Sequence, residues 1–471
     1  MNKKFYLTTA IPYVNSAPHL GFALEIVQAD TIARYHRLLG SDVYFLTGTD
    51  ENALKNVQAA QEKDIPVQQL VDENSEKFYK LKGALNLSFD DFIRTTQKRH
   101  IEGAQALWRA CQKDIYKKKY QGLYCVGCEA FYTEKDLIDG LCPEHQKKPE
   151  LIEEENYFFK LSKYQDWLED LIASDTLKII PEIRKNEVLS FIRRGLEDFS
   201  ISRSKEKAKG WGIPVPDNPS QVIYVWYDAL ANYITALDWH KNSQLFQKYW
   251  PADLHVIGKG ITRFHAVFWP AILKSAGILL PRQEFVHGYL TVEGQKISKS
   301  LGNVIDPFVL VKKHGIDAVR YYLLREIPAY GDGDFSEERF KELYNADLAN
   351  GLGNLVARIA KLCEKSGIIF PVIKINFWEK KTWVSKFLDI FQFDKALAYI
   401  WGNMKRIDKD IDQQQPWNKT EKELEKILKK LQVDILELAS GLQPFLPETA
   451  EKIKKQFSGK IKSGSPLFPR I

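Results

Sequence analysis

The sequence has no apolar run of transmembrane length, few cysteines, and no internal repeat or low-complexity tract. Residues 1–4 lead directly into a strand-like segment rather than into the basic and apolar regions of a signal peptide. These absences exclude a membrane-spanning protein and a repeat architecture, and we expect a cytoplasmic protein with no membrane partner. Only five cysteines occur. In a reducing compartment, clustered cysteines favour metal binding over disulfides.

Length and composition are ordinary for a globular chain. The 471 residues are 44% hydrophobic and 27% charged, and this length accommodates about two to four domains. The formal net charge of +6 fits a nucleic-acid partner but does not by itself imply one.

Strand and helix patterns alternate in two separate parts of the chain. Strands over 3–8 and 42–47 flank a helix over 20–39, and strands over 255–258 and 285–292 flank a helix over 263–276. This order predicts an α/β fold with a parallel sheet. Residues 114–220 break the pattern and are interpreted as an inserted domain. Helical patterns over 347–365, 391–410 and 421–439 predict a C-terminal bundle. The expected domains are 1–113 and 221–292 (the two halves of the sheet), 114–220 (insertion), 293–343 (connector) and 344–471 (bundle).

Two short motifs carry the strongest chemistry. Pro18-His19-Leu20-Gly21 opens the first helix, and Lys296-Ile297-Ser298-Lys299-Ser300 lies in a glycine-flanked loop. A helix start offers backbone N–H groups and a positive dipole to phosphate, and loop lysines can stabilise a leaving pyrophosphate. A lone capping histidine or a solvated lysine run would be the plain alternative. Together the motifs predict a nucleotide held between the two halves of the sheet.

Four residues have the spacing of zinc ligands. Cys125-x-x-Cys128 is followed by Cys142-x-x-His145, two close pairs with glycines between them. Four such ligands predict one structural zinc with no open position for catalysis. The alternative is a set of buried free cysteines.

The chain resembles the methionyl-tRNA synthetases, a family of class I aminoacyl-tRNA synthetases. The two motifs have this order in class I, and residues 10–15 (AIPYVN), 45–51 (FLTGTDE) and 224–229 (YVWYDA) are similar to the methionine family specifically. The resemblance runs from about residue 4 to residue 447. It implies a Rossmann-type catalytic domain split by a zinc-knuckle insertion, a connector that bears the lysine loop and contacts the tRNA stem, and an α-helical anticodon-binding bundle. The implied reaction joins methionine to ATP as methionyl-adenylate, with Mg²⁺ bound to the ATP, and transfers methionine to the 3′ end of tRNA(Met).

The resemblance also implies roles for individual residues. His19, Lys296 and Lys299 would be catalytic. The ATP site would comprise Pro18, His19, Gly21, His287, Gly288, Lys296, Ser298 and Lys299. The methionine site would comprise Ile11, Asp50, Trp226, Ala229, Tyr233, Ile261, His265 and Trp269. Asn354, Arg358 and Trp417 would read the anticodon. Spacing alone also fits plainer roles: Trp226, Ala229 and Tyr233 as a core stripe on one helix, Asp50 as a turn cap, and Asn354 with Arg358 as a surface pair.

The chain departs from the family pattern at three positions. Phe22 stands where a second histidine is usual, Gly260 where aspartate is common, and Ile297 where methionine is commoner. The first two keep open an alternative, a catalytically impaired tRNA-binding paralogue. A synthetase for isoleucine, leucine or valine is a second alternative, but 114–220 leaves no room for an editing domain. With no appended domain after the bundle, we expect a monomer.

Overall fold

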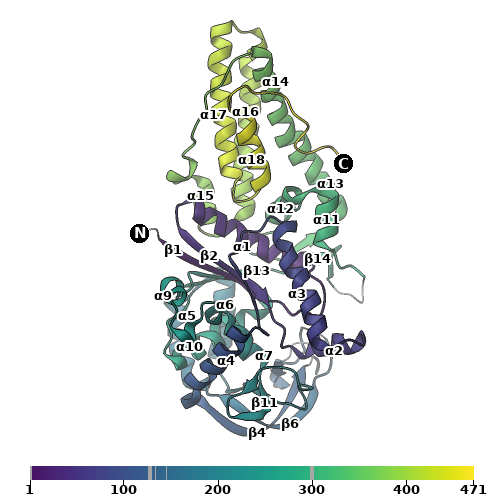
Figure 1. Ribbon diagram of the computed structural model, residues 1–471, viewed down its shortest axis with the longest axis vertical. Coiled ribbons are helices and arrows are strands. Elements are labelled where there is room, and N and C mark those ends of the chain that lie inside the picture. Colours follow the sequence, from purple (N-terminus) through teal and green to yellow (C-terminus); the bar gives the residue numbers. More distant parts are fainter. Residues whose placement is uncertain (1–2, 126–129, 133, 145, 298–301) are drawn as a thin grey trace.

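The computed structural model describes residues 3–125, 130–132, 134–144, 146–297 and 302–471. The molecule is elongated, with a helical bundle at one end, a central sheet, and a smaller antiparallel sheet at the other end (Figure 1). In the described residues, six parallel strands form the central sheet in the order β3-β2-β1-β12-β13-β7. Their bounds are β1 Lys4–Thr9, β2 Asp42–Thr49, β3 Asp91–Arg94, β7 Lys178–Ile180, β12 Leu254–Gly258 and β13 Gln283–His287.

The order of strands reverses at β1. This strand pairs in parallel with β2 on one side (Leu7↔Phe45) and with β12 on the other (Leu7↔Leu254). In an open parallel sheet, the crevice at the carboxyl ends of the two strands that flank such a reversal is where ligands bind. The fold therefore places a ligand site beyond Thr9 and Gly258.

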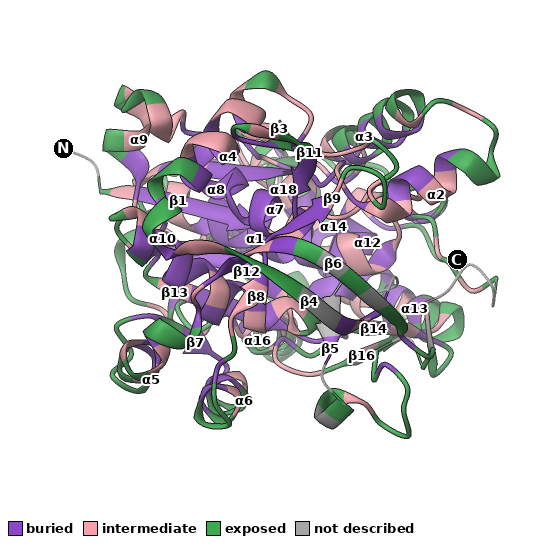
Figure 2. Cartoon of the chain, turned by 90° about the horizontal axis from the view of Figure 1, so that it is seen from below, coloured by how far each residue is buried: buried purple, intermediate pink, exposed green. Residues whose placement is uncertain are grey.

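Alternating side chains of the central strands enter two cores. Phe5 and Leu7 pack on the side of helix α1 (Leu20–Leu38), whereas Tyr6 packs with α4 (Lys98–Ala110) and α10 (Trp269–Ala276). This is the period of two expected for a strand covered on both faces. Figure 2 shows the central strands and α1 buried, with α5 and α9 at the exposed periphery.

The segment expected as an insertion is not wholly separate from the sheet. Its long hairpin pairs β4 (Ile115–Cys125) with β6 (Glu150–Phe159), and β7 then joins the central sheet beside β13. Within residues 114–220 the chain thus returns once to the central sheet, at β7. The other elements here are β5 Ala130–Tyr132, α5 Gln165–Ala173, α6 Glu182–Arg193, β8 Phe199–Ser200, β9 Ser202–Ser204, β10 Pro214–Val215 and β11 Asn218–Ile223.

The expected single strand over 285–292 was wrong. The chain leaves the central sheet after His287 and continues as β14 (Leu290–Val292) in a small sheet with β15 (Gln295–Lys296) and β16 (Gly333–Phe335). Gly288 passes so close to the main chain of Gly331 that a Cβ there would clash with its carbonyl. This long-range contact turns the chain between the two sheets.

Helices complete the fold. The bundle consists of α14 (Asn354–Ser366), α16 (Phe393–Gln414), α17 (Glu421–Leu442) and α18 (Pro447–Gln456), and the segment before α14 is the π-helix η8 (Tyr344–Gly353). Residues of α1, α12 and the bundle belong to one continuous apolar core. The remaining helices are α2 Leu54–Glu62, α3 Val67–Ala84, α7 Val225–Leu230, α8 Asn232–Thr235, α9 Gln244–Tyr249, α11 Pro307–His314, α12 Ile316–Arg325, α13 Glu337–Leu343 and α15 Trp383–Leu388.

A buried arginine joins the bundle to helix α1 and the central sheet. The Arg320 guanidinium donates to the main-chain oxygens of Phe445 (2.8 Å), Pro444 (3.0 Å) and Leu85 (3.1 Å) and forms an ion pair with Asp30 of α1 (2.8 Å). Burial opposes the charge of Asp30, but Arg320 and Arg34 nevertheless hold the pKa of this carboxyl below its ordinary value.

We expect Arg320→Met to lower the free energy of unfolding by about 3–5 kcal/mol, because it leaves a buried carboxylate and three carbonyls without their donor. Urea denaturation would measure this loss. The matched control is Arg339→Met, which removes a half-exposed arginine paired with Glu326 and should cost less than about 1 kcal/mol. Equal small losses would contradict the structural role of Arg320.

Candidate functional site

Helix α1 begins at the carboxyl edge of the sheet with His19 as its cap. The Gly21 amide donates to His19 Nδ1 at 3.1 Å. Since burial lowers the pKa of His19, the ring is neutral near pH 7. Because Nδ1 accepts, the ring proton lies on Nε2, which is left as a donor.

The sequence motifs meet at this helix start. A Cβ on Gly21 would lie 2.9 Å from His19 Cε1 and 3.8 Å from Ile297 Cδ1, so the glycine lets the capping ring fold back beside the lysine loop. The Leu20 amide donates to the Ile305 carbonyl at 3.1 Å. Both described ends of the loop thus contact the first turn of α1. Ser298, Lys299 and the side chain of Lys296 lie outside the described residues.

The amides of this first turn are already engaged. Leu20 and Gly21 donate as above, and Phe22 donates to the His19 carbonyl at 3.0 Å. The expectation of free N–H groups was therefore wrong, because the cap and the chain after the lysine loop satisfy them. The contribution available to a phosphate comes from the dipole and from His19 Nε2.

A histidine and a glutamate lie between α1 and the end of β13. His287 Nε2 is 2.8 Å from Glu25 Oε2, and His287 Nδ1 donates to the Gly288 carbonyl at 2.8 Å. Glu25 Oε1 is buried and has no hydrogen-bond partner in the described part of the chain. Glu25 was missed in the sequence. The available signal was its position four residues after Gly21, on the same helix face.

The structure accounts for both departures from the family pattern. Phe22 packs edge-on against Phe78 of α3, with ring centroids 5.1 Å apart, and so forms an apolar wall. At Gly260, a Cβ would clash with the hydroxyl of Tyr289, which occupies the space of a side chain there. Position 22 thus carries a packed aromatic ring, and the space beside Gly260 is filled by Tyr289.

Aromatic side chains gather around the ends of β1 and β12. Trp226 stacks on Phe264 with centroids 3.9 Å apart and an angle of 3°. Tyr233 donates its hydroxyl to His265 Nε2 (2.7 Å), whose Nδ1 donates to the Ile261 carbonyl (3.0 Å). Burial lowers the pKa of His265 to about 4. The same apolar cluster includes Ile11, Trp226, Tyr233, Ile261 and Trp269.

The expected single helix face over 226–233 was wrong, because α7 ends at Leu230 and α8 begins at Asn232. The Asn232 side chain donates a hydrogen bond to the Ala229 carbonyl at 2.7 Å. In a continuous α-helix this carbonyl would accept from a main-chain amide instead. Trp226 and Tyr233 still reach one cluster, and Ala229 is buried on α7.

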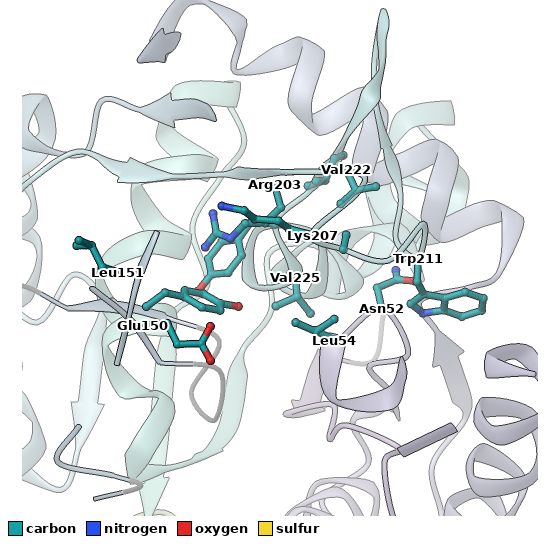
Figure 3. Close-up of a pocket in the computed structure, with 13 residues that line it drawn as sticks. Asn52, Leu54, Glu150, Leu151, Arg203, Lys207, Trp211, Val222 and Val225 are labelled. Atoms are coloured by element: carbon teal, nitrogen blue, oxygen red, sulfur yellow. The ribbon is translucent and has the colours of Figure 1, made fainter. Parts of the chain in front are cut away.

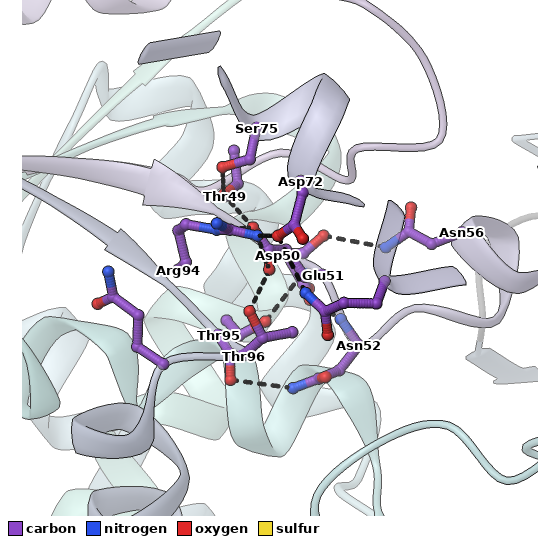
Figure 4. Close-up of polar contacts among 12 residues, drawn as sticks. Thr49, Asp50, Glu51, Asn52, Asn56, Asp72, Ser75, Arg94, Thr95 and Thr96 are labelled. Carbon is purple, nitrogen blue, oxygen red and sulfur yellow. Dashed lines mark hydrogen bonds and ion pairs between the residues drawn. The ribbon is translucent and has the colours of Figure 1, made fainter. Parts of the chain in front are cut away.

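Asp50 lies just past the end of β2 and is held by its neighbours. Its main chain forms an isolated parallel β-bridge with Tyr13, and its Oδ1 accepts a hydrogen bond from the Asn52 amide at 3.2 Å. The next residue, Glu51, is fully buried and accepts from Arg94 Nε (2.6 Å) and Thr49 (3.0 Å). Figure 4 shows these groups converging around the loop. The network fixes the position of Asp50, and nothing in the sequence marked Glu51 for this role.

The predicted metal ligands lie partly outside the described residues. Cys125 at the end of β4 and Cys142 are buried in one small cluster with Tyr132, whereas Cys128 and His145 are not described. In the described ranges, no group of three or more potential ligands could hold a metal.

The three predicted anticodon residues lie in one region of the bundle. Asn354 starts α14, and Arg358 on the same helix pairs with Asp408 (2.8 Å) and Asp412 (2.5 Å) of α16. The Arg358 guanidinium lies 5.8 Å from the ring of Trp417, which is 55% exposed.

No described helix is long and apolar enough to cross a bilayer.

Comparisons with known proteins identify similar chains. A family model described as tRNA synthetases class I (M) matches residues 5–148 and 144–360. The methionine–tRNA ligase of Thermotoga maritima is 42% identical over 508 residues, covering 99% of this chain and 80% of the relative. That of Brucella suis biovar 1 is 42% identical over 507 residues, covering 99% of this chain and 98% of the relative.

Solved structures agree in fold. Mycobacterium tuberculosis methionyl-tRNA synthetase in complex with methionyl-adenylate superposes with a TM-score of 0.92 at 40% identity, covering 99% of this chain and all of the other. The apo form of the same enzyme gives 0.84 at 39% identity, covering all of this chain and 99% of the other.

The depressed pKa of His265 predicts a pH dependence of stability. Between pH 6.5 and about 4 the unfolded chain binds a proton at this histidine that the folded chain does not. Lowering the pH across this window should therefore reduce the free energy of unfolding by roughly 3 kcal/mol through this residue. The difference in free energy of unfolding between the wild type and His265→Gln, measured by urea denaturation, should therefore shrink by that amount as the pH falls from 6.5 to about 4. A constant difference would contradict it.

Proposed function

Because the chain belongs to the methionine–tRNA ligases of the class I tRNA synthetases, we propose that the crevice at the carboxyl ends of β1 and β12 is where methionine is activated. The observation that carries this proposal is the meeting of His19, Gly21 and Ile297 at the start of α1, beside Asp50 and the aromatic cluster. The chain activates methionine with ATP and transfers it to tRNA.

In the first step, a methionine carboxylate oxygen attacks the α-phosphorus of ATP, and the bond to the bridging oxygen breaks to release pyrophosphate. The carboxylate is already ionised, so no general base is needed. Catalysis then rests on positioning and on stabilising negative charge. Mg²⁺ bound to the ATP substrate would neutralise part of the phosphate charge.

The residues of the site divide this work. His19 Nε2–H donates to a phosphate oxygen, and Lys296 and Lys299 stabilise the leaving pyrophosphate. His287 and Gly288, with Pro18 and Ser298, complete the nucleotide site. In the second step, a ribose hydroxyl at the tRNA 3′ end attacks the acyl carbonyl and AMP leaves.

Methionine is held by charge at one end and by aromatic surface at the other. The Asp50 carboxylate pairs with the ammonium group, while Trp226, Tyr233 and Trp269 surround the polarisable thioether. The Tyr233 hydroxyl is already bound to His265, so it presents no unsatisfied donor to the apolar side chain. Ile11, Ala229 and Ile261 complete the pocket.

An impaired paralogue is not favoured. The chain is 42% identical over almost its whole length to methionine–tRNA ligases. Phe22 packs against Phe78, and the Tyr289 hydroxyl lies where a Cβ of residue 260 would be. Ile297, the third departure, packs against the apolar core that includes residues of α1.

The zinc knuckle and the domain division are further parts of the proposal. Cys125, Cys128, Cys142 and His145 would hold one structural zinc, which cross-links the tip of the insertion. Burial of Cys125 and Cys142 in one cluster supports this ligand set. The five expected domains would act together as a cytoplasmic monomer, with residues 293–343 contacting the tRNA stem and 344–471 reading the anticodon.

Methionine-dependent exchange of labelled pyrophosphate into ATP, without tRNA, tests the activity. Lys299→Ala should slow this exchange by about 10²–10³-fold but change the methionine Kd by less than about threefold, because the lysine acts in the transition state. Lys312→Ala, an exposed lysine of α11, is the control and should change neither. Equal losses in rate and affinity would assign Lys299 to binding or folding.

Elemental analysis tests the metal site. We expect one zinc per chain in the wild type and its loss in Cys125→Ser, with faster proteolysis of the insertion, because metal binding supplies folding energy to small domains. Cys363→Ser in the bundle should keep the zinc. A wild type with no zinc, or with two zinc ions per chain, would contradict the proposed single-zinc site.

Anticodon reading is tested by separating charging from activation. Trp417→Ala or Arg358→Ala should raise the KM for tRNA at least about fivefold, as expected for a lost stacking contact, and leave tRNA-free exchange intact. Lys452→Ala on α18 is the control. A parallel fall in exchange would show that these side chains are structural.

A further inference from the structure

Four polar side chains connect the loop that carries Asp50 with the helices that carry the aromatic cluster. Asn52 donates its side-chain amide to Asp228 Oδ2 of α7 at 3.2 Å, and Asp228 Oδ1 lies 3.5 Å from His100 Nε2 of α4. His100 Nδ1 in turn lies 2.8 Å from the hydroxyl oxygen of Thr235 on α8. We call Asn52, Asp228, His100 and Thr235 the polar network.

The network is closed to solvent on the side of the helices. Asp228, His100 and Thr235 are fully buried, whereas Asn52 on the loop is half-buried. Burial raises the pKa of Asp228, although its contacts with His100 and Asn52 act in the opposite direction. A buried carboxyl group that loses such partners costs free energy, so we expect the network to hold the loop against α7 and α8.

Asn52 is the residue that links the network to Asp50. Its main-chain amide donates to Asp50 Oδ1 at 3.2 Å, while its side chain donates to Asp228 and, at 3.4 Å, to the Thr95 carbonyl (Figure 4). Asn52 and Val225, the first residue of α7, also line the same pocket (Figure 3). A displacement of Asn52 would therefore move the Asp50 carboxylate relative to α7.

The main chain of Asp50 has separate support. Its amide donates to the Pro12 carbonyl at 2.9 Å, and its carbonyl accepts from the Asn56 side chain at 3.2 Å. These two bonds do not involve the polar network. Loss of the Asn52 side chain should therefore leave the path of the loop intact and change the direction of the Asp50 carboxylate.

The network lies between the two ends of the proposed methionine site. Asp228 stands two residues after Trp226, and Thr235 stands two residues after Tyr233. These neighbours belong to the part of the site that would hold the thioether, whereas Asp50 would hold the ammonium group. Because one methionine contacts both ends, the distance between them must be fixed.

We propose that Asn52 and Asp228 are positioning residues for the Asp50 carboxylate, which they hold at the distance from the aromatic cluster that a bound methionine requires. This inference rests on the proposed function. It gives Asp228, which would contact no substrate atom, a part in the recognition of the ammonium group of the amino acid. ATP binding at the start of α1 does not require it.

Binding of ligands that differ only at the polar end of methionine tests the assignment. Without ATP, the Kd would be measured for methionine, for methioninol, which keeps the ammonium group and lacks the carboxylate, and for γ-methylthiobutyrate, which lacks the ammonium group. We expect Asn52→Ala to weaken binding of the first two about threefold to tenfold, the range of one hydrogen bond, and to leave the third unchanged. The matched control is Asn345→Ala, which removes a half-buried asparagine of η8 that donates to the Ile471 carbonyl, and it should match the wild type.

Substitutions of Asp228 test its part in the network. Asp228→Ala should show the same selective loss, and the double variant Asn52→Ala/Asp228→Ala should bind no more weakly than either single variant, because both substitutions remove one contact. Asp228→Asn keeps an oxygen that can accept from Asn52 and should bind all three ligands like the wild type. Circular dichroism would check folding, and Asn52→Ala, at a half-buried position, decides the proposal if Asp228→Ala does not fold.

Equal weakening of all three ligands by Asn52→Ala, or of none, would overturn the proposal, as would a selective loss in Asp228→Asn or additive losses in the double variant. A wild type that shows no methionine-dependent pyrophosphate exchange, or that binds γ-methylthiobutyrate as tightly as methionine, would instead overturn the proposed function. These wild-type measurements involve no variant of Asn52 or Asp228, so the two failures are distinguishable.

Discussion

The hydrogen bond from the Gly21 amide to His19 Nδ1 is the contact on which the rest of the site depends. It starts α1 at the carboxyl edge of the sheet, fixes the imidazole tautomer, and leaves Nε2–H as a donor. Gly21 is required because a Cβ would press on the same ring. The chain on either side of the lysine loop then closes over this turn through Ile297 and Ile305. The helix cap, the Nε2–H donor of His19 and the ends of the lysine loop therefore all lie at the first turn of α1.

The same helix connects the site to the far end of the molecule. Asp30 lies 11 residues after His19, about 16 Å along the helix, and is bound by Arg320, whose other donors hold the carbonyls that precede α18. A helix that carries the nucleotide motif at its start and a buried ion pair at its middle, at Asp30, joins the bundle to the carboxyl edge of the sheet. In the proposed function the tRNA contacts both regions, so this geometry would set the distance that it spans.

Local pattern and chemistry in the sequence were enough to predict the parallel sheet, the helices of the bundle and the approach of Ile297, in the second motif, to the start of α1. Contacts between distant segments were not predictable. The break in 285–292 depends on Gly331, and the place of β7 in the sheet depends on pairing with β13 more than a hundred residues later. The split between α7 and α8 follows from one side-chain bond of Asn232.

In the candidate site too, contacts between distant segments could not be predicted from the sequence. Residues with a recognisable motif were found, whereas those that support them were missed. Glu25 lies outside every motif and Glu51 stands next to the better-marked Asp50, and their contacts appear only when the fold brings His287 and Arg94 to them. The packing at Phe22 and Gly260 was also not predictable, because the side chains that lie against these positions, Phe78 and Tyr289, are far away in the chain.

The central claim is that His19 divides its two nitrogens between capping α1 and contacting the nucleotide. Single-turnover formation of methionyl-adenylate in His19→Asn and His19→Gln tests it most directly, because the asparagine amide approximates the position of Nδ1 and the glutamine amide that of Nε2. The account predicts that His19→Asn, which keeps a cap acceptor but has no donor at the Nε2 position, loses about 10²–10³-fold in rate. His19→Gln should retain substantially more activity than His19→Asn. Wild-type rates in His19→Asn would contradict the account.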